Sequence, residues 1–236
     1  MRLIKHLFGV LTVALLSLNT AEAQEKHLFI LSGQSNMSWL DPETFTTTVS
    51  SFFGAEDVIV VKYAIGGKPI RCWFDDWVSQ SFDNSKKDLP NIYNPLLEKT
   101  KEAIGNTAIN TITFVWMQGE RDAREKRGDE YQKNLVRVYN QLTRDLGRND
   151  INMVVGRLSD HDLQNEKYPD WTKIREIQVN LANSNPRFGW IDTDDLNDGF
   201  NNKGDKISND LHMSVSGYKL MGIRFAEKAI TLTQHR

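Results

Sequence analysis

Five short runs rich in β-branched and aromatic residues alternate with longer stretches of helical periodicity along this chain. The short runs cover residues 27–32, 58–64, 111–117, 151–157 and 188–192. Runs of this length and composition predict strands, and the longer stretches between them predict helices. Strands that alternate with helices predict an α/β protein, with a mainly parallel sheet covered on both faces in a three-layer α/β/α sandwich.

Helical periodicity is clearest in three stretches. One apolar stripe consists of Tyr131, Leu135, Val138, Leu142 and Leu146, and a second runs from Trp171 to Leu181. The third lies between residues 214 and 232 and carries Leu220, Ile223, Phe225 and Ala229. We expect all three stripes to pack in the core. Since no repeat or Pro/Gly-rich linker interrupts the pattern, residues 24–236 are expected to form a single domain.

The first 23 residues have the features of a secretory signal peptide. Arg2 and Lys5 precede an apolar stretch at residues 7–20, and residues 21–23 supply the small-x-small pattern that signal peptidase recognises. The apolar stretch is short for a membrane span. We therefore expect cleavage after Ala23, a secreted or periplasmic protein, and no membrane anchor after cleavage; a retained N-terminal anchor is the less favoured alternative.

Charge and cysteine content exclude several classes of function. Removing Arg2, Lys5 and Glu22 from the 29 basic and 31 acidic residues leaves 27 and 30 in the mature chain, with no basic block. We therefore expect no binding to nucleic acid. The single cysteine, Cys72, is expected to be a small hydrophobe without a disulfide partner. No Cys-x-x-Cys or His-Glu-x-x-His pattern is present, so neither a metal nor a cofactor is expected.

Glycines and residues capable of chemistry follow the expected strands. Ser35 follows the first strand, a Gly-Gly pair the second and Gln118 the third, and His212 comes after the fifth. In open parallel sheets ligands bind at the carboxyl ends of the strands. We therefore expect these residues to gather on one rim.

These residue types together fit acyl transfer. A serine hydroxyl is a weak nucleophile and needs a histidine to take its proton. The oxyanion of the tetrahedral intermediate needs N–H donors. Ser35 can offer its own N–H, Gly67 a backbone N–H that no Cβ obstructs, and Gln118 a side-chain amide.

Four segments carry a family resemblance: "GQSNM" (33–37), "GGKPIRCW" (66–73), "WMQGE" (116–120) and "DLHMSVSGY" (210–218). In this order they resemble the sequence blocks of the SGNH, or GDSL-type, hydrolase superfamily. The closest resemblance is to its carbohydrate acetylesterase branch, which includes sialate O-acetylesterases and the acetylxylan esterases of carbohydrate esterase family six. The resemblance implies a flavodoxin-like sandwich and a metal-independent serine esterase. Its substrate would be an acetylated glycan or oligosaccharide, deacetylated through an acyl-enzyme.

The resemblance also implies roles for individual residues. Ser35 would be the nucleophile and His212 the base. Gly67 and Gln118 would join the Ser35 N–H in the oxyanion hole, with Gly66 as the alternative to Gly67. Glu120 is interpreted as an anchor of the loop that carries Gln118, with surface solvation as the alternative.

The acid that supports His212 is the most open assignment. In this superfamily it stands three residues before the histidine, where this chain has Asn209. Asp210 stands two residues before, and residues two apart in an extended segment point to the same side. We favour Asp210 over a Ser–His dyad supported by a neutral group, and Asp205 is a distant third.

Trp39, Trp73 and Trp116 stand beside the motif residues, where they suit either a sugar ring or the core. His161 is expected in a polar loop on the substrate side. Two other functions stay open: a lipid or aryl esterase or thioesterase on the same scaffold, and a catalytically inactive carbohydrate-binding SGNH domain. Intact Ser35, His212 and Gln118 argue against the inactive domain, since binding alone needs none of them.

Overall fold

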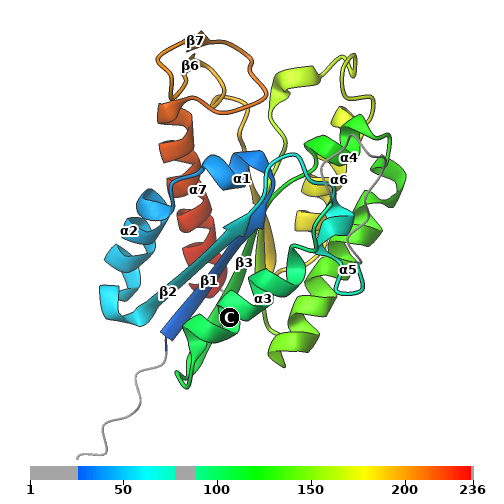
Figure 1. Ribbon diagram of the computed structural model, residues 1–236. Coiled ribbons are helices and arrows are strands. Elements are labelled where there is room, and N and C mark those ends of the chain that lie inside the picture. Colours follow the sequence, from blue (N-terminus) through cyan, green and yellow to red (C-terminus); the bar gives the residue numbers. More distant parts are fainter. Residues whose placement is uncertain (1–25, 78–88, 235–236) are drawn as a thin grey trace, which may run out of the picture.

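The computed structural model describes residues 26–77 and 89–234 (Figure 1). The predicted signal peptide, residues 1–23, lies outside the described residues. Within the described part of the chain, no helix combines the length and the apolar character needed to cross a membrane.

A five-stranded parallel sheet forms the centre of the fold. Its strands are β1 (Lys26–Gly33), β2 (Val58–Ala64), β3 (Ile109–Met117), β4 (Asn152–Gly156) and β5 (Phe188–Ile191), in the order β2-β1-β3-β4-β5. All five predicted strands are confirmed. The order is that of flavodoxin-like folds, in which the strand order reverses between β1 and β3 and leaves a crevice at their carboxyl ends.

Helices cover both faces of this sheet, which confirms the three-layer sandwich (Figure 1). One face carries α2 (Pro42–Phe53) and α7 (Val215–Gln234); the other carries α3 (Tyr93–Ile104), α5 (Gly128–Leu146) and α6 (Trp171–Asn183). Both faces of the sheet are apolar because successive side chains of a strand point to opposite faces, as strand β1 shows. Leu28 and Ile30 join the core under α3, α5 and α6, whereas Phe29 and Leu31 join the core under α2 and α7.

Two elements of the helical layers differ from the sequence prediction. Helix α2 was not expected, because its sequence is rich in Thr and Ser, which are weak helix formers, and it buries only Phe45 and Val49. In α7 the predicted stripe was wrong at Leu220, which is 38% exposed. The buried face instead includes Gly217, Met221 and Phe225, which follow one another at intervals of four residues.

Short elements and loops surround the carboxyl ends of the strands. These are α1 (Ser35–Trp39), α4 (Glu120–Arg124) and a hairpin of β6 (Gly199–Phe200) and β7 (Lys206–Ile207). Gly33 makes the first turn possible: its φ is 149°, and a Cβ there would lie 1.9 Å from the Met117 carbonyl oxygen. This close approach places the segment after β1 beside the segment after β3.

Candidate active site

Ser35 and His212 meet at the carboxyl end of the sheet. Ser35 is the first residue of α1, and His212 lies in the segment between β7 and α7. Ser35 Oγ and His212 Nε2 are 3.1 Å apart, although 177 positions separate the residues. This is the distance that a nucleophile and its general base require. The structure therefore brings together the two residues predicted to share the proton.

The surroundings of His212 favour its neutral form. Its side chain is 26% exposed and stacks on the Trp39 indole, with ring centroids 4.1 Å apart and planes inclined by 28°. Burial lowers the pKa of His212, Asp210 raises it and His161 lowers it further. The net direction is downward, which favours the unprotonated imidazole, the form that can accept a proton from Ser35.

Asp210 lies on the Nδ1 side of the His212 ring but makes no hydrogen bond to it. Asp210 Oδ1 accepts a hydrogen bond from the backbone N–H of His212 at 2.9 Å and lies 3.9 Å from Nδ1. A separation of 3.9 Å is an ion-pair distance, longer than a hydrogen bond. The Asp210 side chain is also 43% exposed, so water screens its charge.

The other candidates for the acid are held elsewhere. Asn209 is left-handed, with φ 46°, and its side-chain oxygen accepts from Asn197 Nδ2 at 3.3 Å. Its carbonyl accepts from His161 Nδ1 at 2.8 Å. Asp205 lies in the β6–β7 turn and accepts from Asn201 Nδ2 at 3.1 Å. Within the described residues, no hydrogen bond joins either candidate to the His212 ring.

The glycine pair after β2 lies beside the nucleophile. Gly66 and Gly67 are both exposed, and Gly67 has a φ of 69°. A Cβ on Gly66 would lie 3.4 Å from Ser35 Cβ, so even the smallest side chain at this position would touch the serine. The structure thus places Gly66, the alternative of the pair, beside Ser35, and the oxyanion role of Gly67 stays a prediction.

Gln118 is engaged in a buried network rather than with Ser35. Its side chain is fully buried, and Nε2 donates to Asp122 Oδ2 at 2.6 Å, to Gln34 Oε1 at 3.2 Å and to the Lys68 carbonyl at 3.2 Å. An amide nitrogen carries two hydrogens, so these acceptors hold both. In this state Gln118 ties the end of β3 to the glycine loop, and its oxyanion role stays a prediction.

Asn36 was missed by the sequence analysis and connects the two halves of the site. Its side chain is buried; Nδ2 donates to Glu120 Oε1 at 2.9 Å and to the Leu211 carbonyl at 3.1 Å. Its Oδ1 accepts from the Tyr218 hydroxyl at 2.9 Å. Asn36, which follows Ser35 in the chain, therefore binds the backbone of Leu211, which precedes His212. The available signal was an amide inside the "GQSNM" block.

Two buried carboxylates stand behind the site. Glu120 is 2% exposed, which excludes surface solvation, and burial raises its pKa to about 7. It accepts from Asn36 and so ties the segment that follows Gln118 to α1, which is compatible with the anchoring role that the sequence analysis gave it. Burial raises the pKa of Asp122 to about 6; its Oδ2 accepts from the Ile70 N–H at 2.8 Å as well as from Gln118.

Other candidate groups have structural partners. Three carboxylates of the acidic run at residues 192–198 pair with arginines: Asp192 with Arg157, Asp194 with Arg157 and Arg175, and Asp195 with Arg224. Cys72 is buried, and burial raises its pKa to about 11. Among the described residues, no group of three or more His, Cys, Asp or Glu is arranged to hold a metal ion.

Most of the chain matches the model of a known protein family. The model of the family described as "SASA: carbohydrate esterase, sialic acid-specific acetylesterase" matches residues 41–231, a range that begins after Ser35 and includes Gly67, Gln118 and His212. A search of curated proteins gives no significant match.

Solved structures with a similar fold come from several sources. A protein from Arabidopsis thaliana has a TM-score of 0.64 and 17% identity, with 88% of this chain and 98% of that chain covered. XAC1771, a carbohydrate acetylesterase from Xanthomonas citri, has a TM-score of 0.60 and 17% identity, with 90% and 57% covered. NanS has a TM-score of 0.64 and 12% identity, with 91% and 99% covered. At these identities the structures show a shared fold.

Burial of Glu120 predicts a specific pH dependence of stability. An unfolded Glu ionises near its ordinary pKa of 4.5, whereas Glu120 keeps its proton up to about pH 7 in the folded protein. The extra proton stabilises the folded state fully below pH 4.5, and this contribution is lost as pH rises through 7. Glu120→Gln cannot ionise, so it should be more stable than the wild type at pH 8, and the difference should vanish towards pH 4.5.

Urea denaturation at pH 5 and pH 8 measures this difference. Glu98→Gln, which changes an exposed carboxylate on α3, is the matched control and should show no such trend. A Glu120→Gln effect of the same size at both pH values would contradict the burial argument.

Proposed function

The chain belongs to the family of carbohydrate esterases described as sialic acid-specific acetylesterases, and from this membership we propose that it is a serine esterase that removes O-acetyl groups from a carbohydrate. The signal-peptide features of the first 23 residues support the further proposal that it is exported. The observation that carries the serine mechanism is the 3.1 Å contact between Ser35 Oγ and His212 Nε2. The neutral state of His212 supports it, because a general base must be unprotonated before the attack.

The proposed reaction proceeds through an acetyl-enzyme. Ser35 Oγ attacks the carbonyl carbon of the ester while His212 Nε2 takes the hydroxyl proton. The oxyanion forms beside the Ser35 N–H and the glycine loop, and His212 returns the proton to the departing sugar oxygen. Water, deprotonated by His212, then attacks the acetyl group on Ser35 and releases acetate. The final proton transfer restores the Ser35 hydroxyl.

Two residues would respond to the charges that develop during this cycle, Asp210 by its own charge and Gln118 by a change of hydrogen-bond partner. When His212 is protonated, the Asp210 carboxylate 3.9 Å from Nδ1 stabilises the imidazolium by charge. Gln118 can donate to the oxyanion only by giving up one of its present acceptors. Its contacts to Gln34 and Lys68 are longer than its contact to Asp122 and would be the ones exchanged. Catalytic hydrogen bonds often tighten only when substrate is bound.

The competing functions fit the described residues less well. A lipid esterase needs an uninterrupted apolar groove, whereas charged and amide side chains from Asp, Glu, Lys and Asn interrupt the apolar wall that Trp39, Ile207, Met213, Val215 and Tyr218 give the hollow beside His212. An inactive binding domain would not need a serine aligned on a neutral histidine. The proposed esterase accounts for both observations.

Acetate release by the purified protein tests the proposal directly. The panel consists of acetylated xylan, pectin, sialic acid and peptidoglycan, with p-nitrophenyl acetate and a long-chain p-nitrophenyl ester as reference esters. We expect acetate from at least one carbohydrate, none from Ser35→Ala, and a preference for the acetyl over the long-chain ester. A long-chain preference would favour the lipid esterase, and inertness towards every ester would favour the binding domain.

Replacing Gln118 by Ala tests the third oxyanion donor. The loss of a donor that acts mainly in the transition state should lower kcat by about 10²–10³-fold with a smaller change in KM. Thermal denaturation of the variant separates this effect from unfolding, since the amide also ties two loops together. An effect confined to KM would mean that Gln118 binds substrate and lies outside the oxyanion hole.

Replacing Asp210 by Asn tests the acid. We expect kcat to fall by about 10–10²-fold, less than the ~10⁴ reported for a buried triad carboxylate, because Asp210 is partly exposed and not bonded to the ring. The acidic limb of kcat/KM against pH should move to lower pH, because Asp210 raises the pKa of His212.

The kcat values of Asn209→Ala and Asp205→Asn are measured under the same conditions as that of Asp210→Asn. If Asp210→Asn retains more than about a tenth of kcat, Asp210 is not the acid. A larger loss in either companion variant would transfer the role to that residue.

A further inference from the structure

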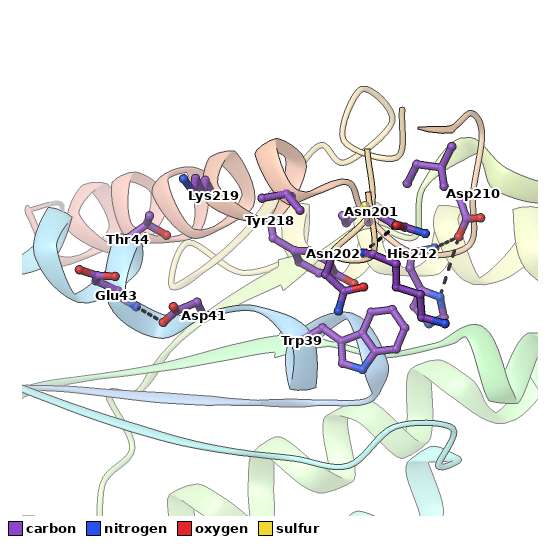
Figure 2. A pocket seen from close by; sticks show the side chains of 14 residues that line it. Trp39, Asp41, Glu43, Thr44, Asn201, Asn202, Asp210, His212, Tyr218 and Lys219 are labelled. Atoms are coloured by element: carbon purple, nitrogen blue, oxygen red, sulfur yellow. Dashed lines mark hydrogen bonds and ion pairs between the residues drawn. The ribbon is translucent and has the colours of Figure 1, made fainter. Parts of the chain in front are cut away.

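A hollow of about 470 Å³ opens directly beside His212 (Figure 2). Its walls come from the start of α2, the β6–β7 hairpin and the first turns of α7, with Trp39 and His212 at one end. The volume is within the range of about 300–1,000 Å³ that small-molecule sites occupy. Because the hollow borders His212, its occupant would be the part of the substrate attached to the leaving oxygen.

Trp39 is the exposed aromatic side chain at this end of the hollow. Trp73 and Trp116 are fully buried and pack edge to face with each other, so they belong to the core. Trp39 is 54% exposed. His212 covers one face of its indole, so the opposite face and the edge make up the exposed part. A flat apolar face at this position can cover the C–H face of a sugar ring, whose removal from water stabilises the contact.

The charges around His212 disfavour an anionic sugar. The hollow is lined by three carboxylates, Asp41, Glu43 and Asp210, and by two ammonium groups, Lys203 and Lys219, with no arginine. A second hollow includes Asn209, three residues before His212 in the chain, and is lined by Asp160, Asp162 and Glu166 against Lys167. Both hollows therefore carry an excess of negative charge. This charge repels a carboxylate that binds within about one Debye length of it.

Neutral hydrogen-bonding groups complete the first hollow. Asn202 lines it from the β6–β7 hairpin, and its amide can both donate to and accept from a sugar hydroxyl. Asn201 also lines it, but its Oδ1 already accepts from the Lys203 and Asp205 N–H groups and its Nδ2 donates to Asp205, so it offers a single N–H. An aromatic face combined with side-chain amides suits an uncharged, hydroxylated ring.

We infer that this hollow binds an uncharged sugar residue of the substrate, with its ring on Trp39, and that the enzyme prefers neutral acetylated sugars to acetylated sialic acid. The inference rests on the proposed esterase function and narrows its substrate class. Sialic acid carries a carboxylate at neutral pH, so its ester would bring a negative charge into a hollow whose lining already has an excess of carboxylates.

The substrate preference is measured as kcat/KM. Acetylated xylo-oligosaccharide and acetylated N-acetylglucosamine represent uncharged sugars, O-acetylated sialic acid represents the anion, and p-nitrophenyl acetate is the reference. At least one uncharged ester should exceed the sialic acid ester by about tenfold or more at low ionic strength, with a smaller ratio in high salt. Equal or higher kcat/KM for acetylated sialic acid would overturn the inference while leaving the esterase proposal intact.

Variants at Trp39 test the stacking contact. Trp39→Ala should raise KM for the preferred sugar ester about 3- to 10-fold and lower its kcat/KM relative to p-nitrophenyl acetate by a similar factor. The ratio cancels any common effect on His212, which touches the same indole. Trp39→Phe should restore most of the ratio, and Phe52→Ala, at a 50% exposed aromatic on α2, should leave it unchanged. An unaltered ratio in Trp39→Ala would contradict the stacking role.

Calorimetric titration with xylotriose, N-acetylglucosamine and sialic acid separates the two proposals. If all esters are inert, the esterase proposal fails, and the inference is judged on binding alone. Binding of an uncharged sugar that Trp39→Ala loses would then support it, and no binding of either uncharged sugar would overturn it.

Discussion

The buried side chain of Asn36 makes the hydrogen bonds on which the geometry of the site depends. They join the helix that begins with Ser35 to Glu120, to Tyr218 of α7 and to the backbone just before His212. Ser35 and His212 are therefore positioned from the same amide rather than by separate loops. Errors of about 1 Å in such an arrangement can cost about 10²-fold in rate. The 3.1 Å contact between nucleophile and base follows from this shared anchor.

The anchor requires ionisable groups to be buried. Glu120 accepts from Asn36, and Asp122 accepts from Gln118 and from the Ile70 N–H. Burial raises the pKa of both carboxyls because water no longer solvates their charge. A buried polar network fixes one arrangement when its members are satisfied and is costly when they are not. The Asn36 amide and the backbone N–H groups of Gly119 and Glu120 lower the pKa of the Glu120 carboxyl, but burial outweighs them.

Much of this arrangement could be predicted from the sequence. Periodicity located all five strands, and the rule for parallel sheets placed Ser35, the glycine pair, Gln118 and His212 at the same edge. Periodicity reports which side of an element is buried, but not which atoms meet. The partners of Gln118, the turn that aims Asp210 at a backbone N–H and the exposure of Trp39 all depend on contacts between segments distant in sequence. Which face of α7 is buried depends on Gly217, which packs against the Leu196 carbonyl. No local sequence pattern reveals this contact.

Labelling with an organophosphate or a sulfonyl fluoride tests the central claim most directly, because such reagents react with a serine activated by a neighbouring base. The account predicts a single covalent adduct on Ser35, located by peptide mass spectrometry, and complete loss of esterase activity in step with labelling. Its rate should follow the deprotonation of His212 and rise with pH through a pKa below 6.5. An adduct on any other serine, or labelling of Ser35→Ala at the wild-type rate, would contradict the account.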